Sequence, residues 1–374
     1  MPRKSTLKKG SLDISAVRSI INKKAGRTVA HTLTEDNPTE VRDWIPTGSR
    51  WLDSIICKGR LAGVPVGKIT EIAGLEATGK SFMAAQIAGN AQKMGIDVVY
   101  FDSESALDPT FLERAGCDLD RLMYVQAESV EFVLETIEEL LTTGNKWLFI
   151  WDSLALTPSI SDVEGDFNPQ SSMAVKPRIL SKGMAKLTIP IADSKATLLV
   201  LNQLKTNMAA RTPAELMTTP YFTPGGKAMS YAYSLRIWLT ARKAKASFIL
   251  DDNGFRVGSE VKVKLEKSRF GTAGRTCNFK ILWGDEDVGV QDEESWFDAI
   301  QISDRLSQSG AWYCLTLNNG EEKKFQRKQW IENLQDELFR ESVLTIIDEH
   351  VIMKFKNREG NAADFYDLEE SSSE

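Results

Sequence analysis

The chain has 374 residues, of which 42% are hydrophobic and 26% charged, and its formal net charge is −6. This composition is typical of a soluble, cytoplasmic globular protein with two or three domains, and no apolar run is long enough to predict a transmembrane helix or a signal peptide. The four cysteines lie far apart and there are only two histidines, which argues against a disulfide framework, a zinc site and a histidine-based catalytic triad.

The first 40 residues are polar and predict one short element. Ile14, Val17, Ile20 and Ile21 recur at helical spacing, which predicts an amphipathic helix. The apolar face of this helix has no obvious partner within its own segment. We therefore expect it to pack either on the main domain or on another subunit.

Residues 74–81 match the phosphate-binding pattern G-x-x-x-x-G-K-[ST]. A buried strand is predicted before them, over residues 67–73, and a helix after them, over 82–93. A glycine-rich turn between strand and helix directs backbone N–H groups and the positive end of a helix at an anion. The pattern predicts contacts to the nucleotide from Gly74, Leu75, Glu76, Ala77, Thr78, Gly79, Lys80, Ser81 and the adjacent Phe82. Lys80 is expected to reach the β- and γ-phosphates, and the Ser81 hydroxyl to ligate Mg²⁺.

Short apolar runs alternate with helical stretches from about residue 45 to 282, which predicts a doubly wound, mostly parallel α/β core of the P-loop NTPase class. Strands are expected at residues 98–102, 147–152, 197–202, 235–241, 261–265 and 277–283, and further helices near 129–142 and 178–193. The last strands follow one another closely and predict an antiparallel extension. Residues 159–173 and 206–226 show neither periodicity and are expected to be loops.

Polar residues at the predicted strand ends are candidates for catalysis. Asp152 follows an apolar strand and is expected to be the second group associated with Mg²⁺. Either Glu104 or Asp102 is placed to activate the attacking water, and spacing alone leaves both open. Gln203 ends another strand just before the long loop, which suggests that it reports the γ-phosphate to that loop.

The C-terminal part begins near residue 290 and predicts a small α+β domain. A helical stripe is expected through Trp296, Phe297, Ile300, Ile302 and Leu306, then a strand over 311–317, a turn over 318–320, and mostly helix over 330–351. Charge is uneven along the chain: residues 176–245 hold twelve Lys or Arg against two acids, and five acids but no base follow Gly360. The basic block is either an anion-binding surface or a set of scattered solvated lysines, and the tail over 359–374 is expected to be disordered.

The phosphate-binding pattern and the polar strand ends, in their order along the chain, closely resemble the motifs of the RecA family of DNA recombinases. The resemblance covers roughly residues 45–334. Residues 102–109 are similar to a family segment whose glutamate is the catalytic base, so the resemblance selects Glu104 over Asp102. It also implies adenine contacts from Asp108 and, by stacking, from Phe111, where the family has tyrosine. Residues 151–158 resemble the second nucleotide motif, which includes Asp152.

The resemblance also implies DNA contacts. Residues 163–166 open what looks like the first DNA-binding loop, and Met173 falls where the family wedges a side chain between bases. Arg178 and Lys205 match basic DNA-contacting positions, whereas a further family arginine falls on the neutral Ala185. Gly225 and Gly226 match the end of the second DNA loop, and the candidates for its wedge are Met208, Met217, Tyr221 and Phe222.

Lys267 and Arg269 resemble a basic pair that reaches across a subunit interface to the ATP of the neighbour, although the family has lysine at the second place. The resemblance therefore implies a helical homo-oligomeric filament with ATP and Mg²⁺ at its joints, in which the N-terminal helix packs on the adjacent subunit. Implied partners are single-stranded DNA, homologous duplex DNA, and single-strand-binding and loader proteins. Residues 266–269 are closer to the bacteriophage (UvsX-like) members than to the cellular ones.

The resemblance implies a recombinase that pairs single-stranded DNA with homologous duplex and exchanges strands, with DNA-stimulated ATP hydrolysis. We divide it into an oligomerisation segment (1–40), an ATPase and DNA-binding core (41–289), a small C-terminal domain (290–358) and an acidic tail (359–374). Two alternatives are a ring-shaped helicase on the same core and a non-catalytic recombination mediator. The short N-terminal segment argues against the helicase, and the presence of Lys80, Glu104 and Asp152 argues against the mediator.

Overall fold

The computed structural model describes residues 13–34, 37–165, 175–208, 212, 220–241, 247–284 and 288–354. The chain divides into two compact units, Met1–Arg42 and Asp43–Glu374. In the first unit, helix α1 (Ile14–Ala25) begins where Asp13 accepts a hydrogen bond from the Ser15 backbone N–H (3.0 Å) and ends at Gly26, whose φ is 68°. This confirms the predicted amphipathic helix, and Ile14 and Ile20 leave more than half of their surface exposed.

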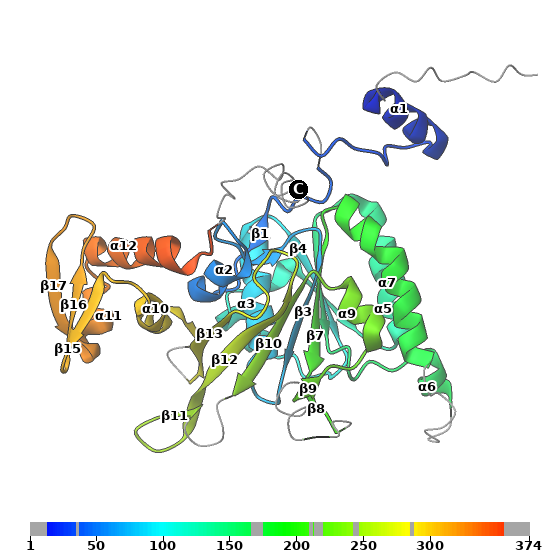
Figure 1. Ribbon diagram of the computed structural model, residues 1–374. Helices are drawn as coiled ribbons and strands as arrows, with labels where there is room; N and C mark the ends of the chain where they lie inside the picture. Colours follow the sequence, from blue (N-terminus) through cyan, green and yellow to red (C-terminus); the bar gives the residue numbers. More distant parts are fainter. Residues whose placement is uncertain are drawn as a thin grey trace, which may run out of the picture. The chain divides into compact units, whose positions relative to one another are not determined.

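The second unit is built on a ten-stranded sheet with the strand order β14-β13-β12-β10-β3-β7-β6-β4-β5, in which β11 also pairs with β12 (Figure 1). The strands from β10 to β5 run parallel, and β12, β13 and β14 extend the sheet in antiparallel fashion. The strands are β3 (Ile69–Gly74), β4 (Asp97–Asp102), β5 (Leu122–Gln126), β6 (Trp147–Asp152), β7 (Thr197–Gln203), β10 (Leu235–Ala241), β11 (Phe248–Leu250), β12 (Arg256–Ser268), β13 (Thr276–Trp283) and β14 (Val288–Gln291). The predicted doubly wound, mostly parallel sheet with an antiparallel extension is confirmed.

Helices cover both faces of the parallel strands. Alternate residues point to opposite faces, so Val98 and Tyr100 pack in one core with helix α3, while Val99 and Phe101 pack in the other with α5 and α7. Burial on both faces explains why β4, β6 and β7 are nearly continuously apolar. The helices that the structure describes in this unit before β10 are α2 (Arg50–Ile56), α3 (Lys80–Lys93), α4 (Pro109–Arg114), η1 (Leu119–Arg121), α5 (Val130–Leu140), η2 (Leu141–Thr143), α6 (Ile160–Glu164), α7 (Val175–Asp193) and α9 (Gly226–Ala232).

Both predicted loops contain short regular elements. Helix α6 lies inside the first, because Asp162 accepts hydrogen bonds from the backbone N–H (3.0 Å) and the hydroxyl (2.6 Å) of Ser159 and so starts a turn of helix. In the second, the strand β8 (Lys205–Thr206) at its start pairs with β9 (Tyr221–Phe222), and α9 begins at its last residue, Gly226. A further two-stranded sheet pairs β1 (Trp44–Ile45) with β2 (Val64–Pro65).

The C-terminal part has helices around a three-stranded antiparallel sheet (Figure 1). The predicted helical stripe ends early: α10 stops at Ile300, Ile302 is exposed, and Leu306 opens a strand, since Ser303 and Asp304 turn the chain. The predicted turn at residues 318–320 is confirmed between β16 and β17. The elements are α10 (Asp292–Ile300), β15 (Leu306–Ser309), β16 (Trp312–Thr316), β17 (Glu322–Gln326), η4 (Arg327–Gln329), α11 (Trp330–Asn333), α12 (Glu337–Ile346) and η5 (Ile347–Val351).

Buried residues of this part, such as Phe325 and Phe339, belong to the same apolar cluster as those around α3. The division of residues 41–358 into a core and a small domain therefore stays a prediction. Within the part of the chain that the structure describes, no helix is both long and apolar enough to cross a membrane.

Candidate active site

The loop between β3 and α3 has the backbone geometry that the phosphate-binding pattern predicts. Gly79, at the start of α3, has a φ of 82°, and a Cβ atom there would lie 2.4 Å from the Ile281 side chain, so only glycine fits. The Thr78 hydroxyl closes the turn by donating to the Leu75 carbonyl oxygen (2.8 Å). The first turn of α3 thus presents its backbone N–H groups to the space in front of the loop.

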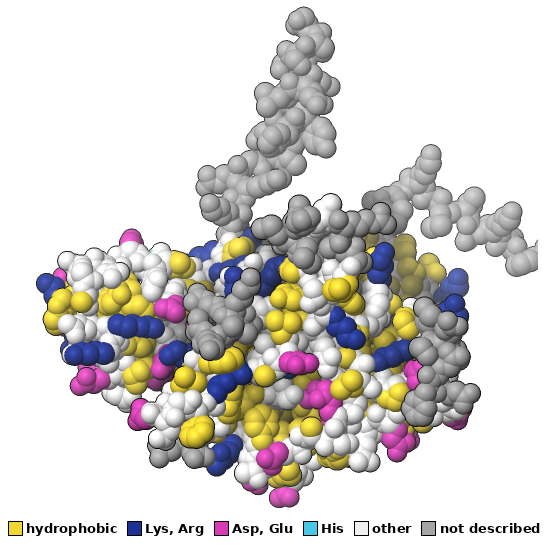
Figure 2. All heavy atoms as spheres, turned by 90° about the horizontal axis from the view of Figure 1, so that it is seen from below, with side chains coloured by type: hydrophobic (Ala, Val, Ile, Leu, Met, Phe, Trp, Pro, Cys, Tyr) yellow, Lys and Arg dark blue, Asp and Glu magenta, His cyan; other side chains and the backbone are white. Residues whose placement is uncertain are grey.

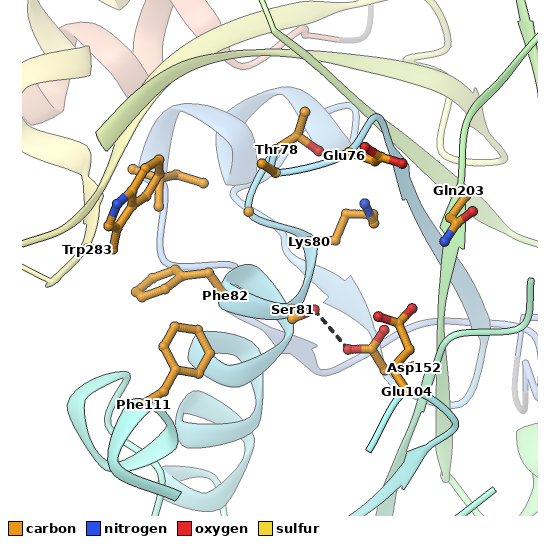
Figure 3. A pocket seen from close by; sticks show the side chains of 13 residues that line it. Glu76, Thr78, Lys80, Ser81, Phe82, Glu104, Phe111, Asp152, Gln203 and Trp283 are labelled. Atoms are coloured by element: carbon orange, nitrogen blue, oxygen red, sulfur yellow. Dashed lines mark hydrogen bonds between the residues drawn. The ribbon is translucent and has the colours of Figure 1, made fainter. Parts of the chain in front are cut away.

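A cavity of about 530 Å³ opens at this loop (Figure 3). Its charged and amide groups gather at one end, and its aromatic rings gather at the other. The lining residues are Glu76, Ala77, Thr78, Gly79, Lys80, Ser81, Phe82, Glu104, Phe111, Asp152, Gln203, Ile281 and Trp283. The structure thus brings together most of the residues predicted to bind and hydrolyse nucleotide, whereas Gly74 and Leu75 lead into the loop without lining the cavity.

Lys80 lies over the loop. Its ammonium donates to the carbonyl oxygens of Leu75 (2.9 Å) and Gly74 (3.3 Å). Burial lowers the pKa of Lys80, while the nearby Asp152 and Glu104 carboxylates act in the opposite direction. A desolvated cation inside a ring of backbone amides favours an anionic ligand such as a phosphate.

Asp152 ends β6 and faces Ser81 across the cavity floor. One carboxylate oxygen accepts hydrogen bonds from the Ser81 hydroxyl (2.8 Å) and from the Tyr100 hydroxyl (2.7 Å). Burial raises the pKa of Asp152, and these two hydrogen bonds partly offset that rise. A hydroxyl and a carboxylate side by side are hard oxygen ligands that fit Mg²⁺. Among the described residues no cluster of three or more His, Cys, Asp and Glu side chains is placed to hold a metal. Phosphate and water oxygens would have to complete such a site.

The two carboxylates at the end of β4 have different surroundings. Asp102 accepts hydrogen bonds from the backbone N–H groups of the four residues Glu104, Ser105, Ala106 and Leu107, at 2.8–3.3 Å, and so closes the turn after the strand. Glu104 lines the cavity and accepts one hydrogen bond, from the Ser153 hydroxyl (3.0 Å). Asp102 therefore stabilises the turn after β4, whereas the Glu104 side chain faces the cavity.

The aromatic end of the cavity contains one ring that the sequence reasoning did not select. Phe82 and Phe111 meet edge to face with their centroids 5.2 Å apart, and Trp283, from β13, faces them (Figure 3). Trp283 is far from the motif in sequence, and its only signal was its place at the end of a predicted strand. Asp108, which was predicted to contact adenine, does not line the cavity: its carboxylate accepts from the Thr110 backbone N–H (2.9 Å) and caps α4.

A chain of buried polar contacts connects the end of β7 with the end of the second loop. The Gln203 backbone N–H donates to the Asn202 side chain (3.0 Å), whose amide donates to Glu71 (3.0 Å) and to the Pro224 carbonyl oxygen (2.9 Å). Glu71 forms an ion pair with Arg236 (2.6 Å), which also donates to the Thr223 hydroxyl (2.8 Å). Residues 223 and 224 are thereby fixed to the strand that carries Gln203.

The predicted DNA-contacting residues lie outside the cavity. Arg178, Lys205 and Met208 are exposed, and Gly225 and Gly226 precede or open α9 with positive φ values of 107° and 79°. Figure 2 views the side on which β8, β9 and α6 end, where basic, acidic and hydrophobic side chains lie interspersed. Met173 and Met217 are outside the described residues.

Lys267 and Arg269 do not line the cavity of their own chain. Both lie at the C-terminal end of α9: Lys267 donates to the carbonyl oxygens of Ser230 (2.7 Å) and Tyr231 (3.2 Å), and Arg269 donates to that of Tyr231 (2.7 Å). Cations are favoured at the negative end of a helix, which accounts for their position in the isolated chain.

A phosphate loop that joins a parallel strand to a helix in a two-sided α/β sheet defines the class of P-loop nucleotide-binding proteins. The family model of the RecA N-terminal domain matches residues 13–288. The chain is 31% identical over 315 residues to Protein RecA of Saccharopolyspora erythraea, covering 82% of this chain and 85% of the relative. It is 33% identical over 298 residues to Protein RecA of Symbiobacterium thermophilum, covering 78% and 79%. The chain therefore belongs to the RecA family. Both relatives are bacterial, and the predicted placement among bacteriophage members stays a prediction.

Proposed function

We propose that this protein is a DNA-dependent ATPase that assembles on single-stranded DNA as a filament, pairs it with homologous duplex DNA and promotes strand exchange. One observation carries the proposal. A single cavity combines Lys80, Glu104, Asp152 and Gln203, while the basic residues that would complete an ATPase site, Lys267 and Arg269, lie elsewhere on the chain.

In the proposed reaction the loop amides and Lys80 hold the phosphates, and the aromatic end of the cavity holds the base between Phe111 and Trp283. Ser81 and Asp152 would hold Mg²⁺, which would supply positive charge to neutralise the charge that develops on the phosphate oxygens. Glu104 orients the attacking water and takes its proton. The hydrogen bond from Ser153 keeps the Glu104 carboxylate directed at that water.

The site of one subunit is completed by the next. Lys267 and Arg269 approach the γ-phosphate of the neighbouring subunit, so hydrolysis depends on assembly. Gln203 contacts the γ-phosphate, and the contacts through Asn202 to Pro224 carry the nucleotide state to the second DNA loop. Arg178 and Lys205 neutralise DNA phosphates, so DNA binding should weaken as the salt concentration rises.

The test is a pair of assays on the purified protein. ATP hydrolysis is measured with and without single-stranded DNA, and joint-molecule formation is measured between a single strand and homologous supercoiled duplex. The proposal predicts stimulated hydrolysis and joint molecules that require ATP. DNA binding without joint molecules would favour a mediator, and closed six-membered rings on DNA in electron micrographs would favour a helicase; either result would overturn the proposal.

A further inference from the structure

Lys176 lies in the first turn of α7, and its ammonium is enclosed by backbone carbonyl groups. It donates to the carbonyl oxygens of Leu154 (2.7 Å), Ala155 (3.1 Å) and Thr157 (2.6 Å). An ammonium has three N–H donors, so these three acceptors use all of them. The segment 154–157 is therefore fixed to the start of α7 by one side chain.

This position is electrostatically costly for a cation. The N-terminal end of a helix carries a partial positive charge, and burial together with the nearby Lys205 lowers the pKa of Lys176 to about 8, while Asp162 of α6 opposes the shift. An apolar side chain would avoid this cost. The three carbonyl oxygens offset it only while segment 154–157 and α7 keep this relative position, so the contact is sensitive to movement of either one.

Segment 154–157, which supplies the carbonyl oxygens, is connected to the candidate active site. Segment 154–157 directly follows Asp152 and Ser153, and the Ser153 hydroxyl donates to Glu104 (3.0 Å). The Leu154 backbone N–H donates to the Leu201 carbonyl oxygen (3.1 Å), two residues before Gln203. A displacement of this segment therefore changes the support of the groups that face the γ-phosphate.

Helix α7, which carries Lys176, also carries a residue predicted to contact DNA. Arg178 follows Lys176 by two residues on the same helical turn and is exposed. A Cβ atom placed on Gly226 would lie 3.6 Å from Pro177, and one placed on Gly225 would lie 2.9 Å from Leu154. The glycine pair that ends the second loop therefore lies close to Pro177 of α7 and to Leu154 of segment 154–157.

We propose that Lys176 is a positioning residue that couples DNA binding at α7 to ATP hydrolysis. This inference rests on the function proposed above. When DNA engages Arg178, the first turn of α7 shifts or becomes rigid, and Lys176 passes this change through segment 154–157 to Ser153 and Glu104. Without the ammonium contact, DNA still binds at Arg178 but no longer changes the geometry of the hydrolytic groups.

The test compares Lys176→Met, which matches the lysine side chain as far as Cε and removes its ammonium, with Lys182→Met as the matched control. Lys182 is exposed on the same helix. For each variant, kcat and KM for ATP are measured with and without single-stranded DNA, and DNA affinity is measured with an ATP analogue. Thermal unfolding confirms that the variants are folded.

The inference predicts that in Lys176→Met the ratio of the DNA-stimulated kcat to the DNA-independent kcat falls about tenfold, within the usual range of coupling between sites, while the affinity for single-stranded DNA stays within about twofold. Lys182→Met should match the unmodified protein. If DNA stimulates ATP hydrolysis by Lys176→Met as strongly as by the unmodified protein, this inference is overturned and the proposed function is not. Absence of stimulation in the unmodified protein overturns the proposed function, and the coupling with it.

A second variant keeps the inference testable if Lys176→Met fails to fold. Lys176→Arg retains a cation that stays charged at all working pH values. Stimulation in the unmodified protein should decline as the pH rises through about 8, where the Lys176 ammonium loses its proton, and the arginine variant should lack this decline. Identical pH profiles for the two proteins would overturn the inference.

Discussion

At the scale of single residues, the structure separates side chains that the sequence pattern leaves equivalent. Asp102 and Glu104 follow the same strand, two residues apart, yet four backbone N–H groups occupy Asp102 while Glu104 faces the cavity. Residue type alone does not distinguish them, because the difference lies in how the chain turns after β4. The Asp108 carboxylate caps α4 and does not line the cavity, and its predicted adenine contact stays a prediction.

Substitution Glu104→Gln should leave ATP binding intact and lower the rate of hydrolysis by about 10²–10⁴-fold, the usual contribution of a general base. The amide retains the size of the side chain and its hydrogen bond with Ser153 but does not accept a proton. Nucleotide affinity and single-turnover hydrolysis measure the two effects separately. Glu113→Gln, on the exposed side of α4, is the control. Hydrolysis at the normal rate in Glu104→Gln would remove Glu104 as the base.

Substitution Trp283→Ala should weaken nucleotide binding roughly three- to tenfold, the effect expected from loss of one aromatic stacking partner. Fluorescent nucleotide titration measures it. Trp312→Ala is the control, because Trp312 is half exposed on β16 and does not line the cavity. Equal affinities for the two variants would mean that the base does not bind at the aromatic end of the cavity.

At the scale of elements, the near-continuous apolar runs predicted β4, β6 and β7 well, because strands covered on both faces bury nearly every side chain. Strand β3 was predicted from its place before the phosphate-binding pattern. Strand β5 was missed, since it lies at the edge of the sheet and leaves Met123 and Tyr124 exposed. Trp283 was missed for a different reason: β13 reaches the cavity only through sheet pairing distant in sequence. The contacts among Glu71, Asn202 and Arg236 come from three strands, so no local pattern indicates them.

Substitution Arg236→Met should lower the free energy of unfolding by about 3–5 kcal/mol, because it leaves the fully buried Glu71 carboxylate without its counter-charge. Urea unfolding followed by circular dichroism measures the change. The double variant Glu71→Gln with Arg236→Met should recover more than half of the loss, since glutamine removes the buried charge and still accepts from Asn202. If the double variant is as unstable as the single one, the buried charge is not the cause.

At the scale of the whole molecule, the candidate active-site cavity and the basic pair Lys267 and Arg269 lie at different places on one chain. The cavity contains the groups proposed to hold phosphates and activate water, and within the chain neither Lys267 nor Arg269 lines it. This separation agrees with the family membership and with a site that two subunits share.

Substitution Lys80→Ala should abolish the effect of nucleotide on DNA affinity, because the phosphates lose the cation that fixes them to the loop. DNA binding measured by fluorescence anisotropy, with and without an ATP analogue, gives the result. Lys93→Ala, at the other end of α3, is the control. A persisting difference between the two nucleotide conditions in Lys80→Ala would contradict the coupling.

The most direct test of the shared site mixes two inactive variants, Glu104→Gln and Lys267→Ala, on single-stranded DNA. Glu104→Gln lacks the base in its own cavity but still offers Lys267 to its neighbour. Lys267→Ala keeps the base in its own cavity but offers no Lys267 to its neighbour. If sites form between subunits in a head-to-tail assembly, an equal mixture has about a quarter of its joints intact, and hydrolysis should return to about that fraction of the normal rate. Activity no higher than the sum of the two separate variants would contradict a site completed by the neighbouring subunit.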